Sequence, residues 1–214
     1  MKVTKISIVI PVYNEEQTIL MVLDRIAAVN LGTVEKEVII VDDGSSDKTR
    51  TILRKLKKES THKIHFHKKN MGKGYALRTG FSFATGDVIV VQDSDLEYHP
   101  KDIKHLLAAY KKNKAQVVYG SRMLGHKKIK HGGLQFYYGG RLINILTNLL
   151  YNTSITDEAT GYKMFDTNLL QSIPLKCQRF EFCPEVTAKI AKRRIKIHEV
   201  PISYTGLYFF ETVS

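Results

Sequence analysis

Short runs of aliphatic and β-branched residues recur along the first part of the chain, and such runs are typical of buried β-strands. They occupy residues 5–12, 37–41, 63–66, 87–91 and 116–119. Most of these runs are continuously apolar and do not alternate with polar positions. This pattern predicts strands that are covered on both faces, as in a mainly parallel sheet.

Helical patterns separate the apolar runs. Apolar residues recur at intervals of three and four within residues 15–29, 47–58, 73–84 and 101–112, which predicts amphipathic helices. Strand and helix therefore alternate along the chain. We expect an α/β fold with a mainly parallel sheet and helices on both of its faces.

The strict alternation ends near residue 120, where a stretch rich in Gly and Lys begins at 121–135. Further on, residues 181–193 have the spacing of a helix and residues 195–203 alternate like a strand. No internal repeat or linker divides the chain. We therefore expect one domain over residues 1–203, followed by a short atypical tail, 204–214.

One helix candidate, residues 136–151, has an unusual distribution of side chains. Ile143, Leu146 and Leu150 share one side, and Asn and Arg residues interrupt the rest. Two interpretations stay open. The helix is either an interfacial element that lies on an anionic membrane or an ordinary core helix that packs on the sheet.

Basic residues are concentrated in the middle of the chain. The 214-residue sequence has a net charge of +12, and residues 103–156 contain nine Lys and Arg residues but no Asp or Glu. This favours an anionic partner, either a phosphorylated metabolite, a membrane surface or nucleic acid. Aromatic and basic residues are not interleaved as on a single-strand-binding surface, so we expect no nucleic acid partner.

The cysteine content and the N-terminal sequence bear on location. Cys177 and Cys183 cannot form a disulfide framework, so we expect reduced thiols and a cytoplasmic location. The first apolar run is short and is followed by acidic residues, unlike a signal peptide. No stretch reaches the roughly 18 continuously apolar residues of a membrane span.

Acidic clusters directly follow three of the predicted strands. Their members are Glu15, which follows Pro11 and Tyr13, then Asp42 and Asp43, and finally Asp93, Asp95 and Glu97. In open α/β sheets, ligands bind outside the carboxyl ends of the strands. Three clusters at such ends predict one polar crevice.

The third cluster has the chemistry of a divalent metal site. Asp93 and Asp95 are two residues apart at a strand exit, so a turn can aim both carboxylates at one hard cation, and Glu97 offers a third oxygen. We expect Mg²⁺ or Mn²⁺, shared with substrate phosphates. For the D-x-D sequence alone, ordinary turn chemistry is the alternative.

The other residues at this edge suit a nucleotide. Asp42 and Asp43 can accept hydrogen bonds from a base or a ribose, and Tyr13 can lie against a base. Residues 70–74 precede a predicted helix, so their backbone N–H groups can face an anion while Lys73 adds positive charge. A helix-entry loop without a ligand is the alternative for that segment.

Seven short motifs occur in a fixed order. They are IVIPVYNE at 8–15, VDDGSSD at 41–47, NMGKGYA at 70–76, DSD at 93–95, GSR at 120–122, DEATGY at 157–162 and EVPI at 199–202. The first four resemble the inverting GT-A glycosyltransferases. The last three resemble the branch that includes dolichyl-phosphate mannosyltransferase and polyprenyl-phosphate glucosyltransferases. The resemblance covers residues 5–203 and implies a GT-A fold with a Rossmann-like sheet.

The resemblance also implies a role for each matched residue. The nucleoside of the donor would be held by Pro11, Tyr13, Glu15, Asp42 and Asp43. The metal and the donor diphosphate would be surrounded by Asp93, Asp95 and Glu97, where Glu97 replaces a Gln of the mannosyltransferase. The catalytic charges would be Asp95, Arg122 and Arg141, of which the two arginines match arginines near the donor and acceptor phosphates.

These motifs imply metal-dependent transfer of a hexose from a nucleotide-sugar, of the GDP-mannose or UDP-glucose type, to a polyprenyl or dolichyl phosphate with inversion. A phosphomonoester has a second pKa near ~6, so the acceptor is largely a dianion in neutral solution and needs no general base. The lipid acceptor implies peripheral contact with the cytoplasmic face of a membrane. Two alternatives stay open: a soluble or polysaccharide acceptor, and a nucleotide-sugar-binding protein with impaired catalysis.

The chain departs from the family after Ser203. Relatives continue with a basic segment that covers the diphosphate, whereas residues 204–214 contain no Lys or Arg. We expect a truncated form with weakened catalysis, because loss of one electrostatic donor costs about 10²–10³ in rate. The alternative is that the apolar tail docks on a membrane and replaces the missing segment.

Overall fold

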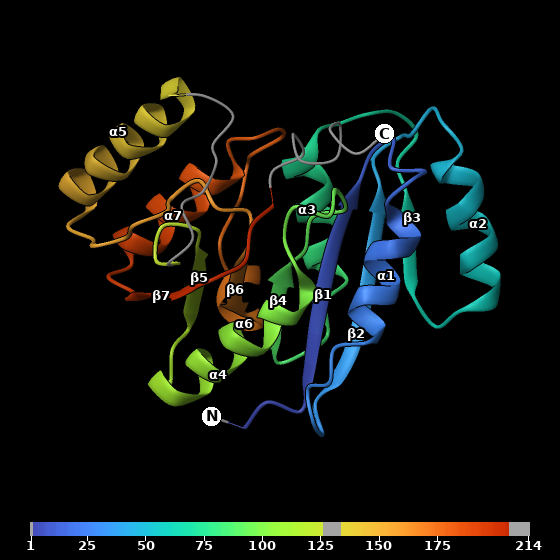
Figure 1. Ribbon diagram of the computed structural model, residues 1–214, viewed down its shortest axis with the longest axis horizontal. Helices are drawn as coiled ribbons and strands as arrows, with labels where there is room; N and C mark the ends of the chain where they lie inside the picture. The colour runs from blue at the N-terminus through green and yellow to red at the C-terminus, as the bar shows by residue number, and fades with distance from the viewer. Residues whose placement is uncertain (1, 126–133, 206–214) are drawn as a thin grey trace.

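The computed structural model describes residues 2–125 and 134–205 (Figure 1). Residues 126–133, within the predicted Gly- and Lys-rich stretch, lie outside the described residues, as do residues 206–214, which make up most of the predicted tail. The expectation of weakened catalysis through the tail therefore stays a prediction.

Seven strands of the described chain form one sheet. In spatial order they are β3 (Lys63–Phe66), β2 (Glu35–Asp42), β1 (Lys5–Val12), β4 (Val88–Val91), β6 (Lys163–Asp166), β5 (Val117–Ser121) and β7 (Ile197–Pro201). Neighbouring strands are parallel, except that β6 runs antiparallel to both β4 and β5. The predicted mainly parallel α/β sheet is confirmed.

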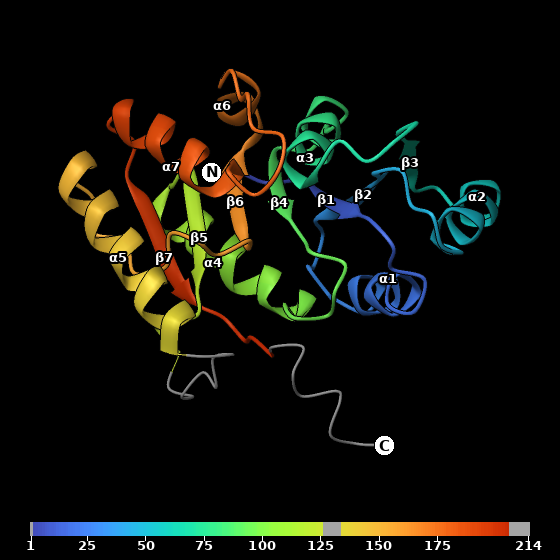
Figure 2. The ribbon, with the colours of Figure 1, turned by 90° about the horizontal axis from the view of Figure 1, so that it is seen from above.

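Helices cover both faces of this sheet (Figure 2). One face carries α1 (Ile19–Ala27), α2 (Thr49–Glu59) and α4 (Ile103–Asn113), which follows a 3₁₀ turn at Pro100–Asp102. The other face carries α3 (Lys73–Ser82), α6 (Thr167–Gln171) and α7 (Phe182–Lys192). The sheet is thus the middle of three layers.

The central strand β1 supplies side chains to both of the resulting cores. Ile8 and Ile10 belong to the core beneath α1 and α4, whereas Val9 belongs to the core beneath α3. All three side chains are fully buried. Successive residues of a strand point to opposite faces, so a strand between two helical layers needs an uninterrupted apolar run.

The hydrophobic pattern does not predict β6 or α6. Strand β6 has four residues and begins with Lys163, a charged residue at a fully buried position. Its ammonium group donates to the carbonyl oxygen of Glu158 at 2.8 Å and lies 3.6 Å from the ring centroid of Tyr119. These partners stabilise the buried charge, and local hydrophobicity gives no sign of them.

Helix α5 (Leu134–Tyr151) lies at the edge of the molecule, beside α7 in both views (Figures 1 and 2). Its apolar side chains are exposed at positions Leu142, Ile143, Ile145, Leu146, Leu149 and Leu150. The interpretation of this segment as a core helix is therefore wrong. Within the described part of the chain, no helix is both long and apolar enough to cross a membrane.

The polar side of α5 faces the domain. The side-chain amide of Asn148 donates to the carbonyl oxygen of Ile155 at 2.9 Å and accepts from the Ile155 N–H at 3.0 Å. One turn earlier, Asn144 donates to the carbonyl oxygen of Thr156 and accepts from the N–H of Glu158. These amides attach the helix to the segment that leads into β6.

Candidate functional site

A cleft of about 540 Å³ opens at the carboxyl ends of β1, β2 and β4. Side chains from all three predicted acidic clusters line it. The lining residues are Pro11, Val12, Tyr13, Glu15, Asp43, Asn70, Gly72, Lys73, Ala76, Asp93, Ser94, Asp95, Arg179 and Phe180. We call this the donor cleft. The predicted convergence of the strand ends on one polar crevice is confirmed.

Asp43 holds the segment that leads into α3, at one wall of the cleft. Its carboxylate accepts hydrogen bonds from the N–H groups of Met71 and Gly72, at 3.0 Å and 2.6 Å, and lies 2.7 Å from Nδ1 of His67. In the same segment, the N–H groups of Gly74 and Tyr75 donate to the backbone carbonyls of Arg179 and Gln178. These four amides are therefore used within the protein. These bonds favour the helix-entry alternative for the four residues, and anion binding by the segment stays a prediction.

Asp42, by contrast, does not line the donor cleft. Its side chain is fully buried, its Oδ1 accepts from the N–H of Ser45 at 3.2 Å, and its Oδ2 lies 3.5 Å from Nε of Arg50. It is not among the lining residues. Two consecutive aspartates at the end of β2 thus have separate surroundings.

Lys73 and Asp93 form an ion pair at the floor of the cleft, with 2.7 Å between Nζ and Oδ1. Burial alone would lower the pKa of Lys73, but the Asp93 charge outweighs it and raises that pKa. Gly161 lies directly behind Asp93, because a Cβ there would stand 2.7 Å from Oδ2. Only glycine leaves room for the carboxylate at this point.

The charged forms of two acids of the cleft, Asp95 and Glu15, are disfavoured by their surroundings. Burial, together with the charge of Asp93, raises the pKa of Asp95 to about 7. Burial and the charges of Asp47 and Asp93 also raise the pKa of Glu15. A cation bound between these carboxylates would relieve the repulsion, and Mg²⁺ commonly uses one or two carboxylates together with substrate phosphates. Asp93 and Asp95 thus fit the predicted divalent metal.

Glu97 lies next to Asp95, because its N–H donates to Oδ1 of Asp95 at 3.0 Å. Its Oε2 accepts from the hydroxyl of Tyr204 at 3.0 Å, and it is not a lining residue. Across residues 2–125 and 134–205, no group of three or more acidic, His or Cys side chains is placed to hold a metal ion. Asp93 and Asp95 line the cleft and Glu97 does not, so a metal contact of Glu97 stays a prediction.

The two predicted arginines lie outside the donor cleft. Arg122 forms a bidentate pair with Asp157, with 2.8 Å for both Nε–Oδ2 and NH2–Oδ1, and its guanidinium lies 5.2 Å from the ring centroid of Tyr204. Arg141 is exposed on α5. Neither lines the cleft.

Sequence patterns do not point to Arg179, Phe180 or His67, although all three belong to or support the cleft. Arg179 and Phe180 reach it from the segment between α6 and α7, a stretch without periodicity. His67 follows the short strand β3 and contacts Asp43 from behind. Placing these residues requires the tertiary structure, in particular the antiparallel strand β6.

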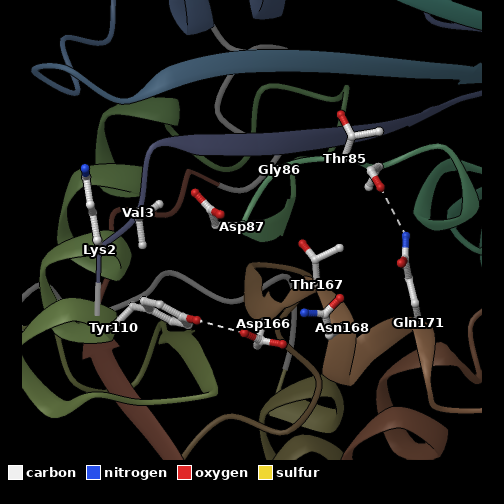
Figure 3. Close-up of a pocket in the computed structure, with 11 residues that line it drawn as sticks. Lys2, Val3, Thr85, Gly86, Asp87, Tyr110, Asp166, Thr167, Asn168 and Gln171 are labelled. Atoms are coloured by element: carbon white, nitrogen blue, oxygen red, sulfur yellow. Dashed lines mark hydrogen bonds between the residues drawn. The ribbon is translucent and has the colours of Figure 1, made fainter.

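A second cavity, of about 450 Å³, lies at the opposite, amino edge of the parallel strands (Figure 3). Several of its polar side chains are used in local bonds. The hydroxyl of Tyr110 donates to Asp166 at 3.2 Å, and Asp87 accepts from the N–H groups of Thr4 and Lys5 at 2.6 Å and 3.0 Å. The first bond connects α4 to the end of β6, and the other two connect the start of β1 to the residue before β4, which is a structural role.

Comparison with known proteins agrees with this architecture. Among solved structures, the chain is similar to glucosyl-3-phosphoglycerate synthase of Mycobacterium tuberculosis in complex with Mn²⁺, UDP and glucosyl-3-phosphoglycerate. The TM-score is 0.72 at 23% identity, and the match covers 97% of this chain and 74% of that chain. The expected GT-A fold is confirmed.

Two sequence relatives have names that specify an acceptor. UDP-N-acetylglucosamine–dolichyl-phosphate N-acetylglucosaminyltransferase of Methanococcus voltae is 31% identical over 215 residues, which cover 92% of this chain and 84% of that protein. Undecaprenyl-phosphate 4-deoxy-4-formamido-L-arabinose transferase of Photorhabdus laumondii is 28% identical over 201 residues, which cover 92% and 59%. Residues 7–173 match the family described as Glycosyl transferase family 2. The match spans most of the sheet and all three acidic clusters of the donor cleft, and the chain belongs to glycosyl transferase family 2.

Proposed function

We propose that this protein transfers a hexose or hexosamine from a nucleoside-diphosphate sugar to a polyprenyl phosphate, with inversion at the anomeric carbon. The observation that carries the proposal is the donor cleft, in which Glu15, Asp43, Asp93, Asp95 and Lys73 meet at the carboxyl edge of a family 2 chain. The names of the two sequence relatives support a polyprenyl-phosphate acceptor.

On this proposal, the donor's nucleoside lies against Tyr13 and Pro11 with Asp43 at the wall. Asp93 and Asp95 would hold Mg²⁺ or Mn²⁺, which supplies positive charge for the diphosphate leaving group. Lys73, at 2.7 Å from Asp93, adds a cation at the same end of the cleft. GDP-mannose and UDP-glucose stay candidate donors, and a relative's name adds UDP-N-acetylglucosamine.

The acceptor needs charge and orientation rather than a base. A lipid monophosphate is largely a dianion in neutral solution, so no side chain must remove a proton from it. Catalysis then comes from positioning and electrostatic stabilisation. We retain Arg141 as the acceptor-phosphate residue, whereas the bidentate bond of Arg122 to Asp157 favours a role in holding the segment that precedes β6.

Helix α5 is the proposed membrane contact. Its two asparagines are bound to the domain, while Leu142, Ile145 and Leu149 are 58%, 59% and 78% exposed. Helix α5 lies within residues 103–156, which contain nine basic and no acidic residues. An apolar helix side in such a basic segment suits the surface of an anionic membrane. A lipid acceptor would then reach the enzyme at the surface where it resides.

The test is transfer itself. The purified chain is incubated with detergent-solubilised undecaprenyl phosphate, Mn²⁺ and each of GDP-mannose, UDP-glucose and UDP-N-acetylglucosamine, and the lipid phase is analysed for glycosylated product. We expect product with one donor class and none with EDTA. Product that forms only on a soluble acceptor such as phosphoglycerate, or donor binding with no transfer to any acceptor, would contradict the proposal.

A further inference from the structure

Residues 176–181, here called the rim loop, cross from α6 to the α3 side of the donor cleft. Hydrogen bonds to α3 and hydrogen bonds within the loop hold its backbone. The carbonyl oxygens of Arg179 and Gln178 accept from the N–H groups of Gly74 and Tyr75, both at 2.9 Å. The Glu181 carboxylate accepts from the N–H groups of Gln178 and Arg179, at 2.8 Å and 3.1 Å. The backbone of Arg179 therefore has a defined position before any ligand binds.

Two glycines of α3 and its entry make this contact possible. A Cβ on Gly72 would stand 2.5 Å from the carbonyl oxygen of Gln178, and a Cβ on Gly74 would stand 2.8 Å from that of Arg179. Gly72 also has a φ of +94°. Any larger residue would push the rim loop away from the cleft, so the sequence of the α3 entry is matched to this loop.

The two side chains at the tip of the rim loop are exposed, although Cγ of Arg179 lies over Gly72. Phe180 is 82% exposed, and both Arg179 and Phe180 line the donor cleft. Across residues 2–125 and 134–205, the Arg179 guanidinium makes no hydrogen bond or salt bridge. A loop with these backbone bonds, whose arginine lines the cleft and makes no hydrogen bond or salt bridge within the described residues, is preorganised for an anionic ligand.

The charges of the residues that line the donor cleft indicate which part of a nucleotide Arg179 would bind. The carboxylates of Glu15, Asp43, Asp93 and Asp95 line the cleft, and its other cation, Lys73, is already paired with Asp93. We propose that Arg179 binds the diphosphate of the nucleotide donor, as a preformed cationic contact opposite the aspartates. The inference rests on the proposed donor and assigns a residue of the rim loop to it. A guanidinium can donate two parallel hydrogen bonds to a phosphate, which makes it well suited to this position.

The experiment compares ligands with and without the diphosphate. Calorimetric titration with UDP, GDP and the corresponding nucleosides, in the presence of Mn²⁺, is carried out on the full chain and on Arg179→Gln, Arg179→Lys and Lys176→Gln. Lys176 is exposed on the same loop and outside the cleft, so Lys176→Gln is a control with the same charge change.

We expect Arg179→Gln to weaken nucleoside diphosphate binding by about ten- to hundredfold, to leave nucleoside binding and the thermal midpoint unchanged, and to be largely rescued by Arg179→Lys. Lys176→Gln should bind like the wild type. Equal diphosphate affinity in wild type and Arg179→Gln would overturn the inference while leaving the donor cleft intact. Failure of the wild type to bind any nucleoside diphosphate would overturn the proposed donor, and the role of Arg179 with it.

Discussion

Helix α1 turns its apolar side toward the sheet, with Ile19, Val22 and Ile26 at most 1% exposed. Helix α5 does the opposite, since Asn148 contacts the domain while Leu149 is 78% exposed. Both helices combine apolar and polar positions at helical spacing. The difference lies in what their neighbours offer: α1 packs against an apolar sheet face, whereas α5 meets a segment whose backbone groups bond to its asparagine side chains.

Backbone groups that are removed from water need hydrogen-bond partners. In the segment after α5, the amide side chains of Asn144 and Asn148 supply them to residues 155–158. The helix is oriented by these bonds, and its apolar side is left for another surface. Exposed apolar patches of this kind commonly mark an interaction site.

The largest expected effect on stability comes from shortening one apolar side chain to alanine on each of the two helices, α1 and α5. Ile26→Ala should destabilise the protein by about 2–5 kcal/mol, because it removes a buried side chain and leaves a cavity. Ile145→Ala, with 59% of the side chain already exposed, should change stability by less than about 0.5 kcal/mol. Urea unfolding measures both. Comparable losses would mean that α5 buries its apolar side in solution.

Lowering the pH should destabilise the sheet through Glu37 and should leave the attachment of α5 unchanged. Glu37, buried at the start of β2, accepts from Ser7 and Thr85 and lies 2.7 Å from Nζ of Lys63. Burial would raise the pKa of Glu37, but these partners outweigh it and hold the pKa well below its usual range. The resulting stability is present above the unfolded-state pKa of about 4.3 and is lost as the pH falls further.

The variant Glu37→Gln tests whether the charge of Glu37 contributes to stability. It should lower the unfolding free energy by about 1–3 kcal/mol near neutral pH, and the gap to the wild type should narrow as the pH falls below about 4. Helix α5 contains no carboxylate of its own. A gap that is constant from neutral to acid pH would show that the charge of Glu37 does not contribute.

The attachment of α5 can be weakened without touching the sheet. Asn148→Ala removes hydrogen bonds to Ile155 and to the hydroxyl of Thr153, which should cost about 1–2 kcal/mol. The loss should be local, so amide hydrogen exchange should accelerate in α5 and residues 153–156 more than in β1. Uniform acceleration across the sheet would contradict an independent attachment.

The sheet and the cleft could be predicted because their signals are local. Continuous apolar runs indicate doubly covered strands, and carboxylates next to their carboxyl ends must meet at one edge. Asp43, Asp93 and Asp95 were therefore accessible to sequence reasoning. The sequence does not distinguish Asp42 from Asp43, although consecutive residues of a strand point in different directions and the Asp42 carboxylate lies 3.5 Å from Nε of Arg50; a nucleoside contact of Asp42 stays a prediction.

Other features depend on contacts between distant segments. The antiparallel strand β6 begins with a buried lysine, and the rim loop reaches the cleft through hydrogen bonds to α3 about 100 residues away. The side of α5 that faces the domain depends on which neighbour needs amide partners. Hydrophobic periodicity predicts that helix, yet it carries no information on this orientation.

The smallest effect on stability should accompany a clear effect on membrane binding. The variant Leu142→Ser, Ile145→Ser, Leu149→Ser changes three exposed side chains of α5 and should alter the unfolding free energy by less than about 1 kcal/mol. Each apolar side chain that enters a bilayer interface contributes hydrophobic free energy, and anionic lipids attract the basic segment around it. Sedimentation with vesicles that contain anionic lipid should therefore show binding by the wild type and about a tenfold or greater loss in the variant.

The control for this variant is Leu20→Ser, Met21→Ser on α1, where both side chains are 47% exposed but lie on a helix whose other side is buried in the core. It removes exposed apolar groups without changing α5, and vesicle binding should persist. If both variants bind like the wild type, α5 is not the membrane contact. If both lose binding equally, general surface hydrophobicity is responsible, and the contrast between α1 and α5 has no bearing on how the protein reaches its acceptor.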